Sequence, residues 1–501
     1  MTELEYLESL STPLLNDLLE SRRESDPQEA LAILQLIAER AHQDDDYEAM
    51  HKWHEEIIEI AQELDEQVAF ANSLYKSGFA LFYLDKEFDA IPRYKQAQQV
   101  NAQLGRDAEL LQCIFGELDC YYCLDEFESV IPIGQEALGI ARVLEDFWSA
   151  GRASLALAKA HQSIANESFT DLLDLNYVTA LEYAEEAHRH FLNSGDAVKI
   201  AESLEECADV LIFIDRNEEA LACIAEGIEY IEEVGRIDPE TSEYLLPKLY
   251  YSKGHIEYEM GMFEVSLISL QKALAIYESS KNSEASSLTA AIHWFMASSL
   301  NSLERGDEAL EEIKLAMSDA KESDETELYY RCLQEQLYVL YKNNRETEAL
   351  FISRGGMAEY ESPGGDKVPS HIYFAFILNA ALCLSELERW SEVLEVLEKI
   401  NTVDDYLVPM NRAVRIDYLR ALAKFGIGEV EEALEILEAI LDSGDVDESD
   451  LDIGDSYALR ARIRKTSHPE ESENDLENAL RIIRALGEDD YVEEVLEKYN
   501  K

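Results

Sequence analysis

Apolar residues recur along this chain at intervals of three and four positions, which is the spacing of one face of an α-helix. The pattern is clear at Ala30, Leu31, Leu34, Ile37 and Ala38, and again at Ala433, Leu434, Leu437 and Ile440. The strict alternation that is typical of strands is almost absent. The 501 residues include only 10 prolines and 21 glycines, so helices are rarely interrupted. The pattern predicts an all-α protein.

Short turns separate the helical segments at a nearly constant interval. Most of them lie about 40 residues apart, at Asp85-Lys86, Asp125-Glu126, Asp215-Arg216, Gly261-Met262, Glu304-Arg305, Lys342-Asn343, Glu388-Arg389 and Gly426-Ile427. A chain of this length is too long for one compact core. A regular interval between turns is instead typical of helix pairs that stack on their neighbours.

One stretch, residues 250–274, shows how the helices of a pair pack. It contains a small residue, a turn glycine, an aromatic residue, a second small residue, a large apolar residue and an alanine, namely Gly254, Gly261, Phe263, Ser266, Leu270 and Ala273. Small residues allow two helices to approach closely, and the large apolar residue fills the space beside them. In this order and spacing, the stretch resembles a tetratricopeptide repeat.

Other parts of the chain repeat this scheme loosely, for example at Gly78, Ala90, Tyr94 and Ala97. The resemblance implies a right-handed superhelical solenoid of about ten or eleven antiparallel helix pairs with a period of roughly 40 residues, longer than the 34 of the consensus repeat. Proteins of this family bind other proteins or peptides.

The expected organisation has five parts. They are N-terminal capping helices over residues 1–45, a repeat array over 46–353, a Gly/Pro-rich break over 354–369, further repeats over 370–487 and a capping helix over 488–501. The break contains two Gly pairs and two prolines, which are strong helix breakers. It can be a hinge that interrupts a second helix, or a long loop between repeats.

The resemblance also implies that the first helix of each pair lines the concave face. The residues expected there are unusually aromatic: Tyr75, Phe79, Phe82, Phe115, Tyr122, Tyr251, His255, Tyr258, Trp294, Tyr338 and Tyr341. Aromatic rings offer a large contact area with few rotors, so this face suits an extended peptide or a partner helix. Alternatively, many of these rings pack between repeats. The Lys/Asn pairs with which chaperone-binding members of the family hold a carboxylate are not evident.

The chain is strongly acidic. It carries 105 acidic and 42 basic residues, a formal net charge of −63. Nucleic-acid binding needs Lys and Arg to displace counterions, and no basic stripe is present, so we expect no direct nucleic-acid binding. Three explanations of the acidity stay open: a well-solvated helical surface, attraction of a basic partner, and adaptation to high salt.

Motifs of enzymes and cofactor sites are missing. There is no phosphate-binding GxxxxGK[ST] loop, no GxGxxG, no HExxH and no GxSxG, so we expect no enzyme and no cofactor. The lone CxxC at Cys120 and Cys123 lacks a second ligand pair, and His51 and His54 are a weak metal candidate, so no metal site is expected. Neither a secretion leader nor a run of about 20 apolar residues is visible, which predicts a cytoplasmic protein without membrane contact.

These observations favour a non-catalytic scaffold or adaptor that binds a protein or peptide in an aromatic groove. One alternative resembles bacterial peptide-responsive regulators, in which a bound peptide changes the curvature of the solenoid. Such a regulator would act on another protein, because residues 1–45 are too short and too acidic for a DNA-binding helix-turn-helix. Another alternative is an acidic mimic that occupies the nucleic-acid site of a basic protein, whose binding would collapse in salt.

Overall fold

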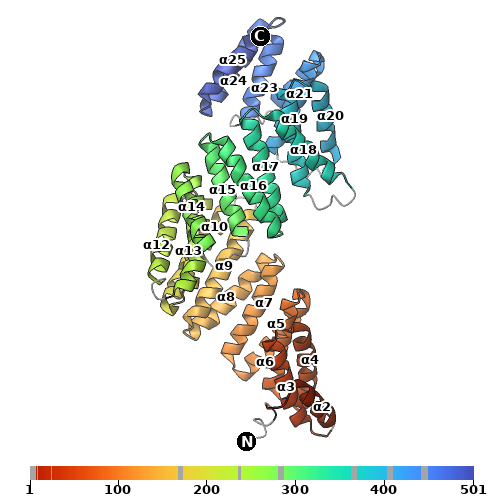
Figure 1. Ribbon diagram of the computed structural model, residues 1–501, viewed down its shortest axis with the longest axis vertical. Coiled ribbons are helices and arrows are strands. Elements are labelled where there is room, and N and C mark those ends of the chain that lie inside the picture. The colour runs from red at the N-terminus through yellow and green to blue at the C-terminus, as the bar shows by residue number, and fades with distance from the viewer. Residues whose placement is uncertain are drawn as a thin grey trace. The chain divides into compact units, whose positions relative to one another are not determined.

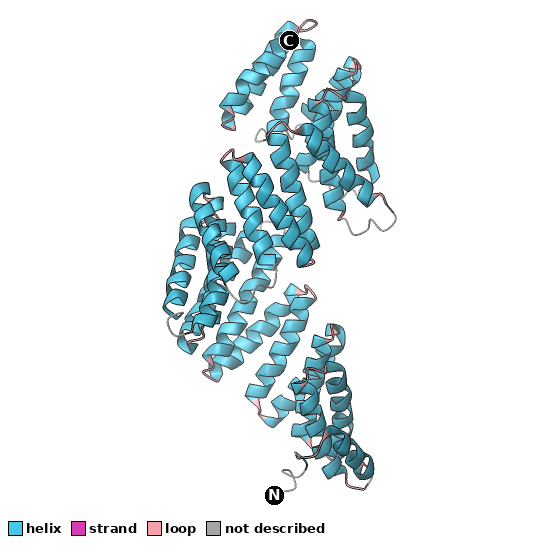
Figure 2. Ribbon diagram, in the orientation of Figure 1, coloured by secondary structure: helices cyan, strands magenta, loops and turns pink. Residues whose placement is uncertain are grey.

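The protein is represented by a computed structural model. It describes residues 7, 9–23, 25–167, 173–234, 238–279, 287–362, 369–402, 410–441 and 450–500. Every regular element within these residues is a helix (Figure 2). The chain divides into two compact units, Met1–Asn282 and Ser283–Lys501. Each is described by itself.

The first unit consists of helices that each contact the next one along the chain (Figure 1). They are α2 (Thr12–Arg22), α3 (Pro27–Gln43), α4 (Tyr47–Glu63), α5 (Gln67–Tyr83), α6 (Glu87–Leu104), α7 (Asp107–Cys123), α8 (Phe127–Val143), α9 (Phe147–Glu167), α10 (Leu173–Ser194), α11 (Ala197–Phe213), α12 (Asn217–Val234), α13 (Pro239–Glu259) and α14 (Phe263–Ser279).

Within the second unit, each helix likewise contacts the next one along the chain. The unit contains α15 (Ser287–Ser302), α16 (Gly306–Glu322), α17 (Thr326–Lys342), α18 (Glu346–Tyr360), α19 (Ser370–Glu386), α20 (Trp390–Glu398), the 3-10 turn η2 (Lys399–Thr402), α21 (Met410–Gly426), α22 (Val430–Leu441), α23 (Leu451–Arg464), α24 (Pro469–Ala485) and α25 (Asp489–Asn500). From α3 onward, odd-numbered helices are the first and even-numbered helices the second members of pairs.

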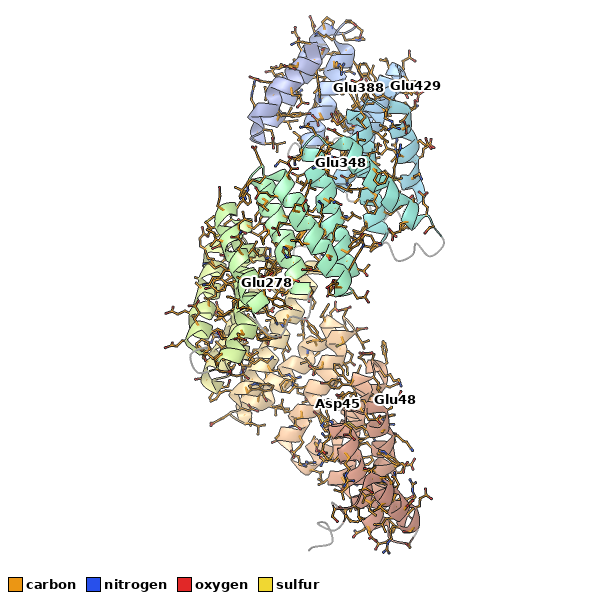
Figure 3. All side chains as sticks on the ribbon, in the orientation of Figure 1. Asp45, Glu48, Glu278, Glu348, Glu388 and Glu429 are labelled. Atoms are coloured by element: carbon orange, nitrogen blue, oxygen red, sulfur yellow. The ribbon has the colours of Figure 1, made fainter. Side chains whose placement is uncertain are left out.

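The links between helices repeat one backbone conformation. A residue in the left-handed region occurs every 20 residues from Asp45 to Glu145, with the positions between them at 65, 85, 105 and 125. Most of these residues are not glycine, and their φ angles lie between 53° and 60°. Asp45 in the first unit and Glu388 in the second are labelled in Figure 3.

Each of these left-handed residues closes one helix and opens the next. The following backbone N–H donates to the carbonyl five residues earlier, as in Lys86 to Leu81 (3.0 Å) and Glu126 to Tyr121 (3.0 Å). This bond satisfies a carbonyl that the helix end would leave free. The donor residue is also the N-cap of the next helix. A 17-residue helix and a three-residue link therefore make one 20-residue half-repeat.

The packing predicted for residues 250–274 is confirmed. A Cβ on Gly254 would lie only 2.6 Å from Cγ of Leu270, so the two helices approach as closely as glycine allows. The Ser266 hydroxyl donates to the Gly254 carbonyl (2.7 Å), and Ser266, Leu270 and Ala273 are buried. Gly261 supplies the left-handed turn, at φ 71°. The tetratricopeptide-like, all-α architecture is thus shown, and it identifies no subfamily.

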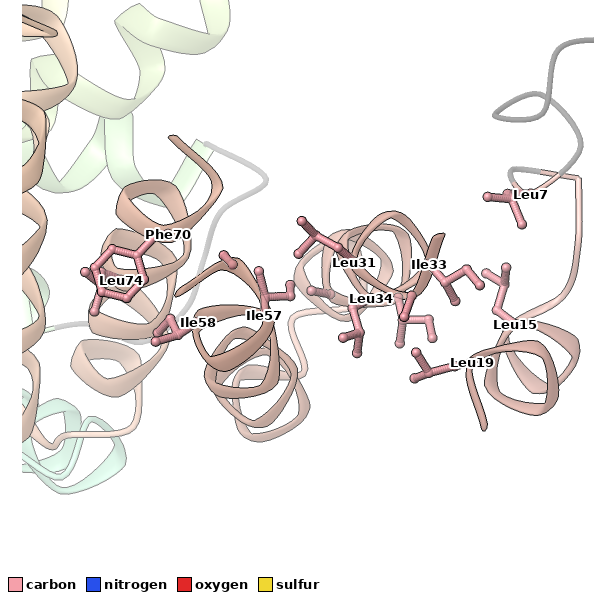
Figure 4. Packing of buried hydrophobic residues seen from close by; sticks show 14 of the residues in the cluster. Leu7, Leu15, Leu19, Leu31, Ile33, Leu34, Ile57, Ile58, Phe70 and Leu74 are labelled. Atoms are coloured by element: carbon pink, nitrogen blue, oxygen red, sulfur yellow. The ribbon is translucent and has the colours of Figure 1, made fainter. Parts of the chain in front are cut away.

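A hydrophobic cluster joins the N-terminal helices to the first repeats (Figure 4). It includes Leu15 and Leu19 of α2, Leu34 of α3, Ile57 of α4 and Leu74 of α5, all of them almost fully buried. At the other end of the chain, Val492 and Val495 of α25 pack against Ile483. Both terminal regions thus cover the apolar face of a neighbouring helix.

The expected break over residues 354–369 is wrong for its first part. Residues 354–360 continue α18, and the Gly355-Gly356 pair lies inside that helix. A Cβ on Gly356 would lie 2.3 Å from the Phe376 ring, so this glycine permits close packing rather than ending the helix. Residues 363–368 of the expected break lie outside the described residues. The other expected domain limits stay predictions.

We expect Glu145→Gly to raise the free energy of unfolding by about 0.5–1 kcal/mol. Glu145 adopts φ 56°, a conformation that costs an L-residue about 1–2 kcal/mol and that glycine adopts without this cost. Glycine also makes the unfolded chain more flexible, which offsets part of the stabilisation. The matched control is Glu136→Gly on the exposed face of α8, which removes the same charge. It should instead cost about 1 kcal/mol, as glycine does within helices. Urea unfolding followed by circular dichroism would contradict this account if both substitutions destabilised the protein.

Candidate functional site

The first helices of neighbouring pairs contact one another and form a shared surface. In the first unit, α5 contacts α7, α9 contacts α11 and α11 contacts α13. Side chains on these helices that point away from the second helices therefore lie side by side. Two clusters on this surface stand out, one aromatic and one acidic.

The first cluster forms a pocket with a volume of about 530 Å³, which we call the aromatic pocket. Its main lining residues are Tyr75, Phe79, Phe82 and Tyr83 of α5, Phe115 and Asp119 of α7, and Trp148 and Arg152 of α9. Tyr75, Phe79 and Tyr83 follow one another along one face of α5 because they are spaced by four residues.

The rings of the aromatic pocket hold one another in place. The centroids of Phe79 and Tyr83 lie 4.7 Å apart, and those of Tyr75 and Phe79 lie 6.5 Å apart. Tyr83 also stacks on Tyr47 of α4 at 4.7 Å, with only 10° between the ring planes. These distances are typical of favourable aromatic pairs. The rings of the pocket wall therefore contact one another in the absence of a ligand.

Arg152 places a positive charge within this aromatic surface. Its guanidinium lies 4.3 Å from the centroid of the Phe115 ring and 2.6 Å from Oδ2 of Asp119. A guanidinium over an aromatic face is attracted by the ring quadrupole. The indole N–H of Trp148 donates to Asp196, the N-cap residue of α11 (3.0 Å), which orients that ring.

The second cluster, here called the acidic site, consists of Glu202, Glu205, Glu206 and Asp209 on α11. Lys159 of α9 and Lys199 both bind Glu202, at 3.2 Å and 2.6 Å.

Among the described residues, Glu205 and Glu206 have weaker hydrogen-bond partners than Glu202, or none. The Ser252 hydroxyl of α13 lies 3.4 Å from Glu205 as a weak donor. Glu206 is only 6% exposed, and its Oε1 is buried without a hydrogen-bond partner.

Burial raises the pKa of two carboxyls in the acidic site. The pKa of Glu206 rises to about 8 and that of Glu205 to about 7, each mainly because the charged form loses water. Lys159 acts in the opposite direction on Glu206, since a nearby cation favours the carboxylate. Neighbouring acids on α11 raise the pKa of Glu206 further.

The second unit has a pocket of its own, with a volume of about 450 Å³. Tyr418 of α21, Asp455 of α23 and Tyr491 of α25 contribute to its wall. The Tyr491 hydroxyl donates to Asp455 (2.8 Å), and burial raises the pKa of Asp455 to about 6. Aromatic rings and a half-buried acid thus occur together in this unit as well.

The predicted groove residues fall into several groups. Tyr75, Phe79, Phe82 and Phe115 line the aromatic pocket. Tyr122 is 37% exposed, further along α7. Their role in binding stays a prediction.

The other predicted residues lie outside that pocket. On α13, His255 pairs with Glu259 (3.6 Å) and Tyr258 packs against Phe263, while Tyr251 is half-buried. In the second unit, Trp294 packs against Phe295, Tyr338 is 54% exposed, and the Tyr341 hydroxyl lies 3.4 Å from Glu386.

Sequence reasoning missed Tyr83, Trp148 and Arg152 of the aromatic pocket, and it missed the acidic site. Arg152 follows Phe115 by roughly one repeat, so repeat spacing was a usable signal for it. The acids of α11 offered no such signal because the chain holds 105 acidic residues. What distinguishes Glu206 is its burial, which depends on where neighbouring helices lie.

The described residues include no group of three His, Cys, Asp or Glu side chains that could hold a metal ion. His51 instead bonds to Ser77 (3.0 Å). In the CxxC segment Cys120 is buried, which raises the pKa of its thiol to about 12, whereas Cys123 is exposed. Among the helices described, none has the length and apolar character to cross a membrane.

No protein-family model and no curated protein matches this chain. Solved structures with similar folds include the apo quorum sensor NprR from B. thuringiensis, with TM-score 0.46 and 14% identity over 76% of this chain and 99% of that one. A tetratricopeptide repeat protein from Parabacteroides merdae has TM-score 0.37 and 17% identity over 64% and 99%.

A third similar structure is a signal transduction ATPase with numerous domains and a tetratricopeptide repeat sensor, from Pyrococcus horikoshii. It has TM-score 0.48 and 14% identity, and covers 83% of this chain and 54% of that one. At these scores the similarities bear on neither ligand nor activity.

We expect the free energy of unfolding to fall as the pH rises from about 5 to 8, and Glu206→Gln to weaken this fall. The folded-state pKa of Glu206, about 8, exceeds its ordinary value of 4.5. The folded protein therefore holds a proton that the unfolded chain releases, so the stabilisation is complete below pH 4.5 and is lost as the pH passes 8. Each such group contributes up to about 1.4 kcal/mol per pH unit.

Several other groups face this carboxyl and titrate or carry charge. They are Lys159 of α9, Tyr122 of α7, and Glu202, Glu205 and Asp209 of α11 itself, while Lys248 of α13 acts on the neighbouring Glu205. The control is Glu229→Gln, on the exposed face of α12. Denaturant unfolding at pH 5, 7 and 8.5 should show a smaller slope for Glu206→Gln only. Equal slopes in both variants would contradict a protonated, buried Glu206.

Proposed function

We propose that this protein is a non-catalytic scaffold or adaptor that binds an extended peptide segment of another protein along the first helices of its first unit. The observation that carries this proposal is the aromatic pocket, in which rings from α5, α7 and α9 surround a volume of about 530 Å³. Rings of this kind are the usual anchors of protein interfaces.

The partially exposed rings of the pocket are the binding elements. Tyr83 is 51% exposed and Trp148 is 38% exposed, so both present apolar area that a ligand could cover. Asp119 and Arg152 supply one acceptor and one donor group beside these rings. A pocket that combines apolar walls with a few polar groups fixes the orientation of its ligand.

Preorganisation is the mechanism by which the pocket gains affinity. The ring contacts on α5 and the bond from Trp148 to Asp196 hold the lining side chains in one arrangement. A ligand then loses its own conformational freedom on binding, but the protein loses little. A role as a peptide-responsive regulator would use this same pocket, with the peptide as the signal.

We expect Tyr83→Ala and Trp148→Ala each to weaken peptide binding by about tenfold or more, as truncation of an aromatic anchor does. Both side chains are partly exposed, so neither variant threatens the fold. The probe is the best binder from a displayed library of random 12-residue peptides, with affinity measured by fluorescence polarisation at 150 mM salt.

The matched control is Phe88→Ala, which removes a ring that is 74% exposed on the second helix α6. Its affinity should equal that of the unmodified protein. Equal affinity in all three variants, or a library without binders, would refute peptide binding in the aromatic pocket. An affinity that vanishes in high salt for every variant would favour the acidic mimic instead.

A further inference from the structure

The acidic site contains a buried carboxyl group that the protein itself does not satisfy. Within the described part of the chain, Oε1 of Glu206 accepts no hydrogen bond, although the side chain is only 6% exposed. An unsatisfied buried acceptor is costly, and buried polar groups in proteins almost always have a partner. Among the described residues, Oε1 of Glu206 is thus left without a partner, and a ligand that reaches the site could supply one.

The nearby cations of the protein do not supply this partner. Lys159 and Lys199 both bind Glu202, at 3.2 Å and 2.6 Å. The Ser252 hydroxyl is a weak hydrogen-bond donor to Glu205 and carries no charge. Among the described residues, the site thus holds more carboxyl groups than it has cations in contact with them, and burial raises the pKa of Glu206 to about 8, so this carboxyl is mainly protonated at neutral pH. A ligand cation can take the place of that proton.

The acidic site lies close to the aromatic pocket. Arg152 of the pocket and Lys159 are both on α9, two helical turns or about 10 Å apart along the axis. Lys159 then reaches across to Glu202 on α11 (3.2 Å). An extended peptide rises about 3.3 Å per residue, so roughly three to five residues separate the two sites.

We propose that the acidic site binds the side-chain cation of a lysine or arginine that lies about three to five residues from the apolar residue held in the aromatic pocket. This inference rests on the proposed function, because it names the chemistry of the peptide that the first unit binds. The occupant is a peptide and not a metal ion, since no three ligating side chains among the described residues are placed to hold one.

Position-specific selection tests this proposal. The probe is a displayed library of random 12-residue peptides, selected at 150 mM salt on the unmodified protein and on Glu206→Gln, Trp148→Ala and Glu229→Gln. General attraction to an acidic protein would enrich Lys and Arg at every position. The proposal predicts enrichment at a fixed distance from an apolar residue.

The variants separate this inference from the proposed function. Glu206→Gln should lose the positional Lys/Arg enrichment but keep the apolar one, whereas Trp148→Ala should lose the apolar enrichment. The exposed control Glu229→Gln should match the unmodified protein. Replacing the selected basic residue by Gln should then weaken binding about tenfold to the unmodified protein, but less than twofold to Glu206→Gln.

Other outcomes would overturn the inference. If the basic enrichment were absent, or persisted unchanged in Glu206→Gln, the acidic site would not be the cation site, while loss of binding in Trp148→Ala would still support the aromatic pocket. If no variant changed the selected peptides, both proposals would fall. Glu205→Gln and Asp209→Asn offer second substitutions in the same site, with the same expected loss.

Discussion

The organisation of this protein depends on one backbone constraint, the left-handed residue that links consecutive helices. This residue lets the next N–H donate to the carbonyl five positions back, so the chain reverses within three residues. From Asp45 to Glu145 the links come every 20 residues, which keeps helix lengths equal and places corresponding side chains at corresponding heights. The constraint is met mainly by Asp and Glu, although glycine would adopt the conformation more easily.

The functional surface follows from that regularity. Small residues such as Gly254 allow the helices of a pair to pack closely, which leaves one face of each first helix outside the pair. In the first unit these faces carry the aromatic pocket and, across α9 and α11, the acidic site. In the acidic site, Glu206 gives up water without gaining a hydrogen bond to Oε1 in the described structure.

The fold could be predicted from the sequence because its determinants are local. Turn spacing and the pattern from Gly254 to Ala273 indicated paired helices, and ring positions on α5 and α7 indicated four residues of the aromatic pocket. The helical course of residues 354–360 could not be predicted, since only the position of Phe376 explains the internal glycines. Likewise, Glu206 is buried because of where neighbouring helices lie, and nothing in the sequence distinguishes it from the other acidic residues of the chain.

The central claim is that a peptide lies across the first helices of the first unit. Photo-cross-linking tests it most directly, with benzoylphenylalanine in place of the apolar residue of a selected peptide and mass spectrometry to locate the adducts. The account predicts adducts on α5, α7 and α9, at the side chains that line the aromatic pocket. Adducts concentrated on the second helices α6, α8 and α10, or in the second unit, would contradict it.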